Sequence, residues 1–137
     1  MSCIFCKIIS KEIPAEIVFE DENSLAFLDI FPRAPGHTVV IPKTHSVNII
    51  DSPEQEIPGL FLTVKKITGI LQSTFSPDGF TIGINHGEVA GQSVPHLHVH
   101  IMPRFKGDKG SSLHGVVNNP PKEDLKAIAQ RMRIIKK

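Results

Sequence analysis

Residues 94–102, VPHLHVHIM, carry the pattern that decides the fold prediction. Histidine and aliphatic residues alternate, as is typical of a β-strand, whose successive side chains point to opposite faces. His96, His98 and His100 should therefore share one face, about 6 to 7 Å apart per step. The aliphatic residues that should enter the core are Leu97, Val99 and Ile101. We weigh three interpretations of the histidine face: a chance polar surface, a metal site of three histidines, and nucleophilic or acid–base chemistry, which we favour.

Four further strands and two helices are predicted around this stretch. Strands are expected at residues 15–20, 24–30, 37–42 and 80–84, where apolar runs are bounded by turn residues. A helix should open at 52–54 (Ser-Pro-Glu), and Pro58 either kinks it or moves its start later. Its apolar stripe, at helical spacing, is Leu60, Val64, Ile67 and Leu71.

A loop at 106–121 and a second helix at 123–135 complete the chain. The apolar positions of that helix are Leu125, Ile128, Met132 and Ile135. Short neighbouring strands with one long and one terminal helix predict an α+β fold on an antiparallel sheet.

Composition excludes several classes of protein. The chain has 137 residues, and 15 Lys and Arg against 14 Asp and Glu leave a net charge of +1. We therefore expect no electrostatic binding to nucleic acid. No apolar run approaches the roughly 18 residues of a membrane span, and residues 1–14 lack a leader pattern. We expect a cytoplasmic protein without a membrane partner.

Residues 91–93, Gly-Gln-Ser, form a loop just before the histidines. Backbone N–H groups beside a glycine, with an amide and a hydroxyl, can hold phosphate oxygens without a charged side chain. An ordinary turn is the alternative interpretation.

The segment 95–104, PHLHVHIMPR, resembles the His-φ-His-φ-His-φ-φ signature of the histidine triad (HIT) superfamily, φ being an apolar residue. Residues 3–45 are similar to the N-terminal half of its HINT-like branch, and residues 84–104 to the second half. The resemblance implies one HIT domain over 1–137, with a core at about 3–105 and a tail and helix at 106–137. It implies a HIT-like α+β fold with about five antiparallel strands, a long helix and a C-terminal helix, as in bacterial members.

The resemblance implies a nucleotide hydrolase or transferase. It would cleave the α-phosphate bond of purine nucleoside phosphoramidates or related AMP and GMP conjugates. By position His98 is the nucleophile that forms a nucleotidyl-histidine, and His100 contacts the phosphate. His96 is the first histidine of the triad, and His37 supports the triad from a neighbouring strand. Without the resemblance, His37 could equally be a surface histidine at a strand edge.

The resemblance also implies a nucleotide pocket. Asp29 would accept from the ribose hydroxyls, a natural pairing for a carboxylate. The residues expected to wall the purine are Phe19, Phe27 and Ile30, although the two phenylalanines could equally be plain core residues. Polar contacts to the phosphate or leaving group are expected from Asn85, Gln92 and Ser93. His86, where an acid is common in the family, and Pro95 depart from the pattern and could alter leaving-group preference.

Cys3 and Cys6 form a C-x-x-C motif. In such a chain the motif indicates metal or redox chemistry more than a disulfide framework. The resemblance implies that His45 and His96 complete a closed Cys₂His₂ set for a structural Zn²⁺. A redox pair and two plain buried thiols are the alternatives.

Three functional alternatives remain beside the phosphoramidase. They are a dinucleoside polyphosphate hydrolase, a nucleotide-binding protein without catalysis, and a metal centre of three histidines. The resemblance further implies a homodimer that pairs through the long helix and a strand.

Overall fold

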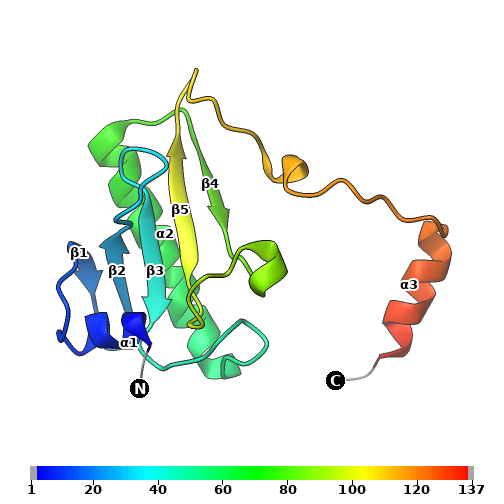
Figure 1. Ribbon diagram of the computed structural model, residues 1–137, viewed down its shortest axis with the longest axis horizontal. Helices are drawn as coiled ribbons and strands as arrows, with labels where there is room; N and C mark the ends of the chain where they lie inside the picture. The colour runs from blue at the N-terminus through cyan, green and yellow to red at the C-terminus, as the bar shows by residue number, and fades with distance from the viewer. Residues whose placement is uncertain (1–2, 136–137) are drawn as a thin grey trace.

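The computed structural model describes residues 3–135 and has an α+β fold, as predicted (Figure 1). Five antiparallel strands form one sheet in the order β1-β2-β3-β5-β4. The elements in chain order are α1 (Ile4–Ile9), β1 (Ile17–Glu20), β2 (Ser24–Leu28), β3 (Thr38–Pro42), α2 (Ile57–Phe75), β4 (Gly79–Gly83), β5 (Val99–Arg104) and α3 (Leu125–Ile134). Within the described part, no helix is long and apolar enough to cross a bilayer.

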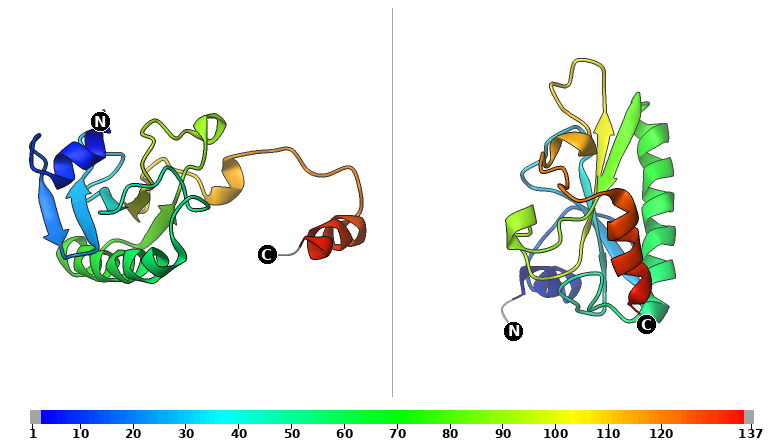
Figure 2. Two further views of the ribbon diagram at one scale, coloured as in Figure 1. Left: turned by 90° about the horizontal axis from the view of Figure 1, so that it is seen from below. Right: turned by 90° about the vertical axis from the view of Figure 1, so that its right-hand side faces the viewer.

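Helix α2 covers one face of the sheet (Figure 2). Its predicted apolar stripe is buried against aliphatic residues of β2, β3 and β5, and this cluster forms the main core. The helix begins later than Ser52, because a 3₁₀ turn at Glu54–Glu56 precedes it. Pro58 therefore lies in the first turn of α2, where its missing N–H costs no helical hydrogen bond.

The opposite face carries α1, which covers only the half made by the early strands (Figure 2). Ile8 of α1 joins a second buried cluster with Leu25, Phe27, Val39 and Ile41. Among residues 3–135, no α-helix covers β5 and β4 on this side. The site described below uses that uncovered part.

Strand β5 differs from the prediction at both ends. It spans Val99–Arg104 and not residues 94–102, so that His96, in a bend, and His98 lie in the segment before it. The N–H of Leu97 donates to Ser46 O at 2.7 Å, a loop carbonyl, which explains why sheet pairing starts later. The alternation of faces is nevertheless as predicted, because Leu97, Val99 and Ile101 are at most 1% exposed in the core.

Helix α3 forms close to its predicted position but away from the sheet (Figure 1). Asp124 caps it by accepting a 2.8 Å hydrogen bond from the N–H of Ala127. Of the four predicted apolar positions, Leu125, Met132 and Ile135, the last just after the helix, are each more than 70% exposed, and Ile128 is partly buried. The helix was thus predictable from its periodicity. Its apolar side chains, however, belong to neither of the buried clusters formed by the described residues.

Candidate functional site

His98 is held in one tautomer by the backbone. The side chain is 6% exposed, and its Nδ1 lies 2.7 Å from the carbonyl oxygen of His96. A carbonyl can only accept, so Nδ1 carries the proton of the neutral ring. The other nitrogen, Nε2, therefore keeps its lone pair. A fixed neutral tautomer with one free nitrogen is what nucleophilic attack by imidazole requires.

His37 and His100 form a second ordered pair beside it. The N–H of Arg33 donates to His37 Nδ1 at 3.1 Å, so that the proton of a neutral His37 must sit on Nε2. This Nε2 lies 2.9 Å from His100 Nδ1, which accepts the hydrogen bond. The remaining proton of His100 is then on its Nε2. His100 is thereby set up as a hydrogen-bond donor.

Burial keeps this pair neutral. It lowers the pKa of His37, and it lowers the pKa of His100 to about 4, where the neighbouring rings of His98 and His37 add to the effect. The Asp29 carboxylate opposes both shifts, with Oδ2 lying 3.5 Å from His37 Nε2. Near pH 7 both rings are therefore uncharged, and the site offers hydrogen bonds without imidazolium charge from this pair.

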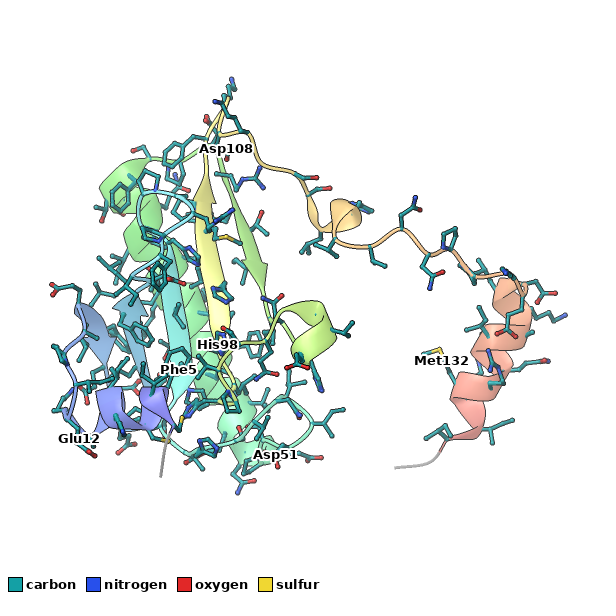
Figure 3. The ribbon with its side chains drawn as sticks, in the orientation of Figure 1. Phe5, Glu12, Asp51, His98, Asp108 and Met132 are labelled. Atoms are coloured by element: carbon teal, nitrogen blue, oxygen red, sulfur yellow. The ribbon has the colours of Figure 1, made fainter. Side chains whose placement is uncertain are left out.

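Phe5 belongs to this site, and the sequence analysis missed it. Its ring meets the rings of His98 and Phe27 edge-on at centroid distances of 5.1 and 5.3 Å (Figure 3). The available signal was its place between the two cysteines of the C-x-x-C motif. Because Cys3 and Cys6 approach His96, the helix that carries Phe5 is held against the histidines.

The assignment of Phe19 to the purine pocket is wrong. Phe19 pairs with Ala26 in the sheet register and packs against the α2 core, with Lys66 Nζ 5.3 Å from its ring centroid. Phe27 pairs with Val39 and lies in the cluster on the other face, together with Phe5. Alternation along the strands therefore places Phe27 on the site face and Phe19 on the opposite one.

The other predicted binding residues lie in loops. Ile30 is 76% exposed after β2, and Asn85 and Ser93 are exposed in the segment between β4 and β5. Asn85 lines a cavity together with His100. The Gln92 amide does not extend toward a phosphate but bonds to the backbone: its Nε2 donates to Val47 O and Val94 O, and its Oε1 accepts from Gly87 N–H. These three hydrogen bonds of Gln92 stabilise the conformation of the loop.

Four side chains gather at the start of α1 as a candidate metal centre. Their ligand atoms, Cys3 Sγ, Cys6 Sγ, His45 Nδ1 and His96 Nδ1, all lie within 4.8 Å of one another. Tetrahedral zinc with bonds of about 2.3 Å to sulfur and about 2.0 Å to nitrogen needs ligand separations of about 3.3 to 3.8 Å. His96 Nδ1 lies 3.4 Å from Cys3 Sγ and 3.6 Å from Cys6 Sγ, His45 Nδ1 lies 3.3 Å from Cys6 Sγ, and the two nitrogens are 3.1 Å apart. The donor set therefore fits zinc.

Hydrogen bonding supports the same conclusion. His96 Nε2 lies 2.9 Å from the carbonyl oxygen of Pro42, so that its proton is on Nε2 and its Nδ1 lone pair faces the cluster. Burial also lowers the pKa of His96. Burial and the neighbouring Cys3 raise the pKa of Cys6 to about 11. That shift is opposite to the one that activates a redox C-x-x-C thiol.

Comparisons with known proteins identify the family of this chain. The HIT domain family matches residues 10–107, and the chain belongs to this family. It is 49% identical over 117 residues to an uncharacterized HIT-like protein of Methanocaldococcus jannaschii, covering 85% of this chain and 90% of that one.

Two solved structures are also similar to this chain. A histidine triad nucleotide-binding protein from Candida albicans has a TM-score of 0.82 at 32% identity, over 97% of this chain and 94% of that one. A Zn-bound histidine triad family protein from Mycobacterium smegmatis has a TM-score of 0.76 at 39% identity, over 98% and 99%. The fold and the histidine pattern therefore place this chain in a family that includes nucleotide-binding proteins.

Proposed function

We propose that this protein hydrolyses purine nucleoside phosphoramidates, or related AMP and GMP conjugates, at the α-phosphate. The observation that carries the proposal is the hydrogen bond between His98 Nδ1 and His96 O, which leaves His98 Nε2 free to attack. Two-step displacement through a covalent enzyme intermediate replaces one difficult reaction by two easier ones.

In the first step the lone pair of His98 Nε2 forms a bond to phosphorus. The bond from phosphorus to the leaving nitrogen or oxygen breaks, and the leaving group takes a proton from solvent. In the second step water attacks phosphorus, releases the nucleoside monophosphate and loses one proton to solvent. His98 returns to its neutral form.

Two groups support binding and charge stabilisation. His100 Nε2–H, oriented through His37, would donate to a phosphate oxygen as negative charge develops there. Asp29 would accept from the ribose diol. Its Oδ1 already accepts a 2.8 Å hydrogen bond from Phe31 N–H, which fixes the carboxylate at the end of β2. Phe5 and Phe27 supply an aromatic wall on the same side.

The test is AMP release from adenosine 5′-phosphoramidate. The wild-type protein should turn the compound over, and His98→Ala should lose at least about 100-fold in rate. His114→Ala, at an exposed histidine in the tail, is the matched control and should retain full activity. Turnover that persists in His98→Ala would exclude the covalent role of His98, and an inert wild type would exclude phosphoramidase activity.

A dinucleoside polyphosphate hydrolase is the second candidate. Arg33 and Lys109 line the cavity beside His100, and two cations there suit a longer phosphate chain. In the same assay, a higher kcat/KM for diadenosine tetraphosphate than for the phosphoramidate would favour this candidate.

We also propose that the Cys₂His₂ cluster binds a structural zinc ion. Such an ion would tie α1 to the segment that carries His96, and so hold Phe5 and His98 in place. Its four ligands would close the coordination sphere and leave no position for substrate. The catalytic steps above therefore use only the side chains of the chain.

We further propose that the protein is a homodimer. Phe61, Leu62 and Ile70 of α2 are 39%, 61% and 48% exposed, and β4 is an edge strand of the sheet. Exposed apolar groups on a helix beside an open sheet edge suit pairing with a second copy. Analytical ultracentrifugation should give twice the chain mass, and a monomer at micromolar concentration would contradict this.

A further inference from the structure

The loop between β2 and β3 carries Asp29 and His37 of the site. It is closed by hydrogen bonds from Asp29 N–H to His37 O at 3.0 Å and from His37 N–H to Ala34 O at 3.1 Å. Residues 30–33 are exposed, so that packing against the core does not hold this part of the loop. The N–H of Arg33, which sets the tautomer of His37, belongs to the exposed part. Its position therefore depends on the contacts that the rest of the loop makes.

Gly36 is the point at which this loop meets α2. Figure 1 shows the loop and the last turn of α2 at the same end of the sheet. A Cβ at Gly36 would lie 2.7 Å from Phe75 Cε2 and 2.9 Å from Leu71 Cδ2, so that both side chains lie against the glycine backbone. Gly36 has φ +84°, and its carbonyl oxygen accepts a 2.8 Å hydrogen bond from Thr38 Oγ1. The ring of Phe75 therefore supports the loop one residue before His37.

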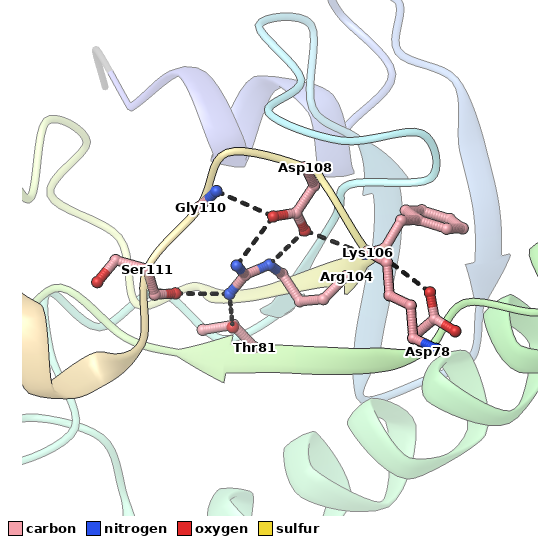
Figure 4. Close-up of polar contacts among 8 residues, drawn as sticks. Asp78, Thr81, Arg104, Lys106, Asp108, Gly110 and Ser111 are labelled. Atoms are coloured by element: carbon pink, nitrogen blue, oxygen red, sulfur yellow. Dashed lines mark hydrogen bonds and ion pairs between the residues drawn. The ribbon is translucent and has the colours of Figure 1, made fainter.

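The end of α2 that carries Phe75 is itself fixed. Ser76 takes the left-handed conformation that ends the helix. Two residues further on, Asp78 N–H donates to Arg104 O at 2.8 Å, and Asp78 Oδ2 accepts from Lys106 N–H at 2.9 Å (Figure 4). These hydrogen bonds tie the turn after α2 to the end of β5.

Strand β5 also carries His100, so that the two histidines of the ordered pair are both placed relative to the end of α2. His100 lies on the strand to which this end is tied, and His37 lies on the loop that Phe75 supports. The 2.9 Å hydrogen bond from His37 Nε2 to His100 Nδ1 joins the two parts. The 3.1 Å hydrogen bond from Arg33 N–H to His37 Nδ1 lies within the loop. Such bonds are normally about 2.7 to 3.2 Å long, so that a displacement of the loop by about 0.5 Å would weaken both.

We propose that Phe75 is a positioning residue of the site, whose ring holds the loop so that His37 donates to His100 and not the reverse. The inference rests on the proposed function, because Phe75 would act through the donor that His100 directs at the phosphate. Without the ring, Gly36 can move into the vacated space, and Arg33 N–H then leaves His37 Nδ1. His37 can carry its proton on Nδ1 and accept from His100 Nδ1–H. His100 Nε2 then has no proton to donate.

The test measures tautomers and turnover in variants of Phe75, which is 40% exposed and can be shortened without opening the main core. In Phe75→Ala, nitrogen-15 NMR should show that His37 and His100 lose their preference for a proton on Nε2. The kcat for AMP release from adenosine 5′-phosphoramidate should fall about 5- to 30-fold. Phe75→Leu has no atom in the place of Cε2, and it should shift the tautomers in the same direction if Phe75→Ala does not fold. Phe75→Tyr retains the ring edge beside Gly36 and should keep the wild-type tautomers and rate.

Val64→Ala is the matched control, because it also removes apolar packing from α2 but lies in the main core and not at the loop. It should lower the unfolding temperature and leave the tautomers and kcat of the wild type. Wild-type tautomers in the folded Phe75→Ala or Phe75→Leu protein would overturn the inference. An equal tautomer shift in Val64→Ala, or a defect in Phe75→Tyr as large as in Phe75→Ala, would also overturn it. The same holds for an unchanged kcat in a Phe75→Ala protein whose tautomers have shifted.

The NMR measurement separates failure of this inference from failure of the proposed function, because the tautomers are observed without substrate. A tautomer shift in Phe75→Ala together with an inert wild type would support the positioning of the histidine pair and refute phosphoramidase activity. An active wild type, with tautomers that Phe75→Ala leaves unchanged, would support the proposed function and refute the role of Phe75.

Discussion

Replacing His37 should weaken catalysis through His100 without changing the nucleophile. Arg33 N–H occupies His37 Nδ1, and His37 Nε2 lies 2.9 Å from His100 Nδ1. His37→Leu fills this buried position with an apolar side chain but removes the Nε2–H donor. His100 Nδ1 then has no proton from that side, and the ring can hold its proton on Nδ1 instead. The donor directed at the phosphate would be lost in that tautomer.

The magnitude follows from one hydrogen bond in a buried place. His37 is 4% exposed, and leaving a buried polar group without its partner costs about 1 to 3 kcal/mol. If this cost falls on the transition state, kcat should fall about 5- to 150-fold. His37→Gln is the matched variant, because its amide nitrogen can replace Nε2 as the donor and should recover most of the activity.

The assay is AMP release from adenosine 5′-phosphoramidate, with the thermal unfolding of each variant as a control for folding. Nitrogen-15 NMR of the ring nitrogens reports the tautomer of His100 directly. His100 should be protonated on Nε2 in the wild type and in His37→Gln, and should lose this preference in His37→Leu. A folded His37→Leu protein with full activity and an unchanged tautomer would refute the reasoning.

Three further predictions concern metal, pH and packing. The purified protein should contain about one zinc ion per protomer. Cys6→Ser should lower both the zinc content and the unfolding temperature. A zinc content in Cys6→Ser equal to that of the wild type would contradict the proposed Cys₂His₂ ligand set. His100 has its pKa lowered from 6.5 to about 4, so the unfolded chain binds more protons than the fold between these values. The free energy of unfolding should therefore fall as the pH falls across that window, by about 3 kcal/mol at most. The fall should be smaller in His100→Asn. If urea unfolding gave the same dependence of this free energy on pH for the wild type and for His100→Asn, the prediction would be contradicted. Gly36 has φ +84°, and a Cβ there would lie 2.7 Å from Phe75 Cε2. Gly36→Ala should lower the free energy of unfolding, measured with urea, by about 2 to 4 kcal/mol. An unchanged free energy of unfolding would show that the end of α2 shifts to make room for the added Cβ.

The periodic parts of the chain were predictable from sequence. The alternation around His98 and the helical stripe of α2 are each repeated several times within one element, and the structure confirms both. The ligand set around Cys3 and Cys6 followed from family resemblance, and its four donor atoms do come together. A prediction from a repeated or highly specific pattern stays correct even when the predicted boundary of an element is wrong by a few residues.

Features that depend on a single face or contact were not predictable in the same way. Phe19 and Phe27 are both strand phenylalanines, and only the register of β1 and β2 decides which one faces the site. The role of Phe5 depends on α1 packing against His98, a contact between residues far apart in sequence. The loop prediction for 106–121 gave no sign that Arg104 would fix its beginning.

The most direct test of the central claim is to trap the covalent intermediate. The reaction with adenosine 5′-phosphoramidate is quenched within its first turnover and analysed by mass spectrometry of the intact protein and of its peptides. We expect one added adenylyl group on the peptide that contains His98, and none on His98→Ala. An adenylyl group on another residue, or AMP release by His98→Ala at the wild-type rate, would contradict the account.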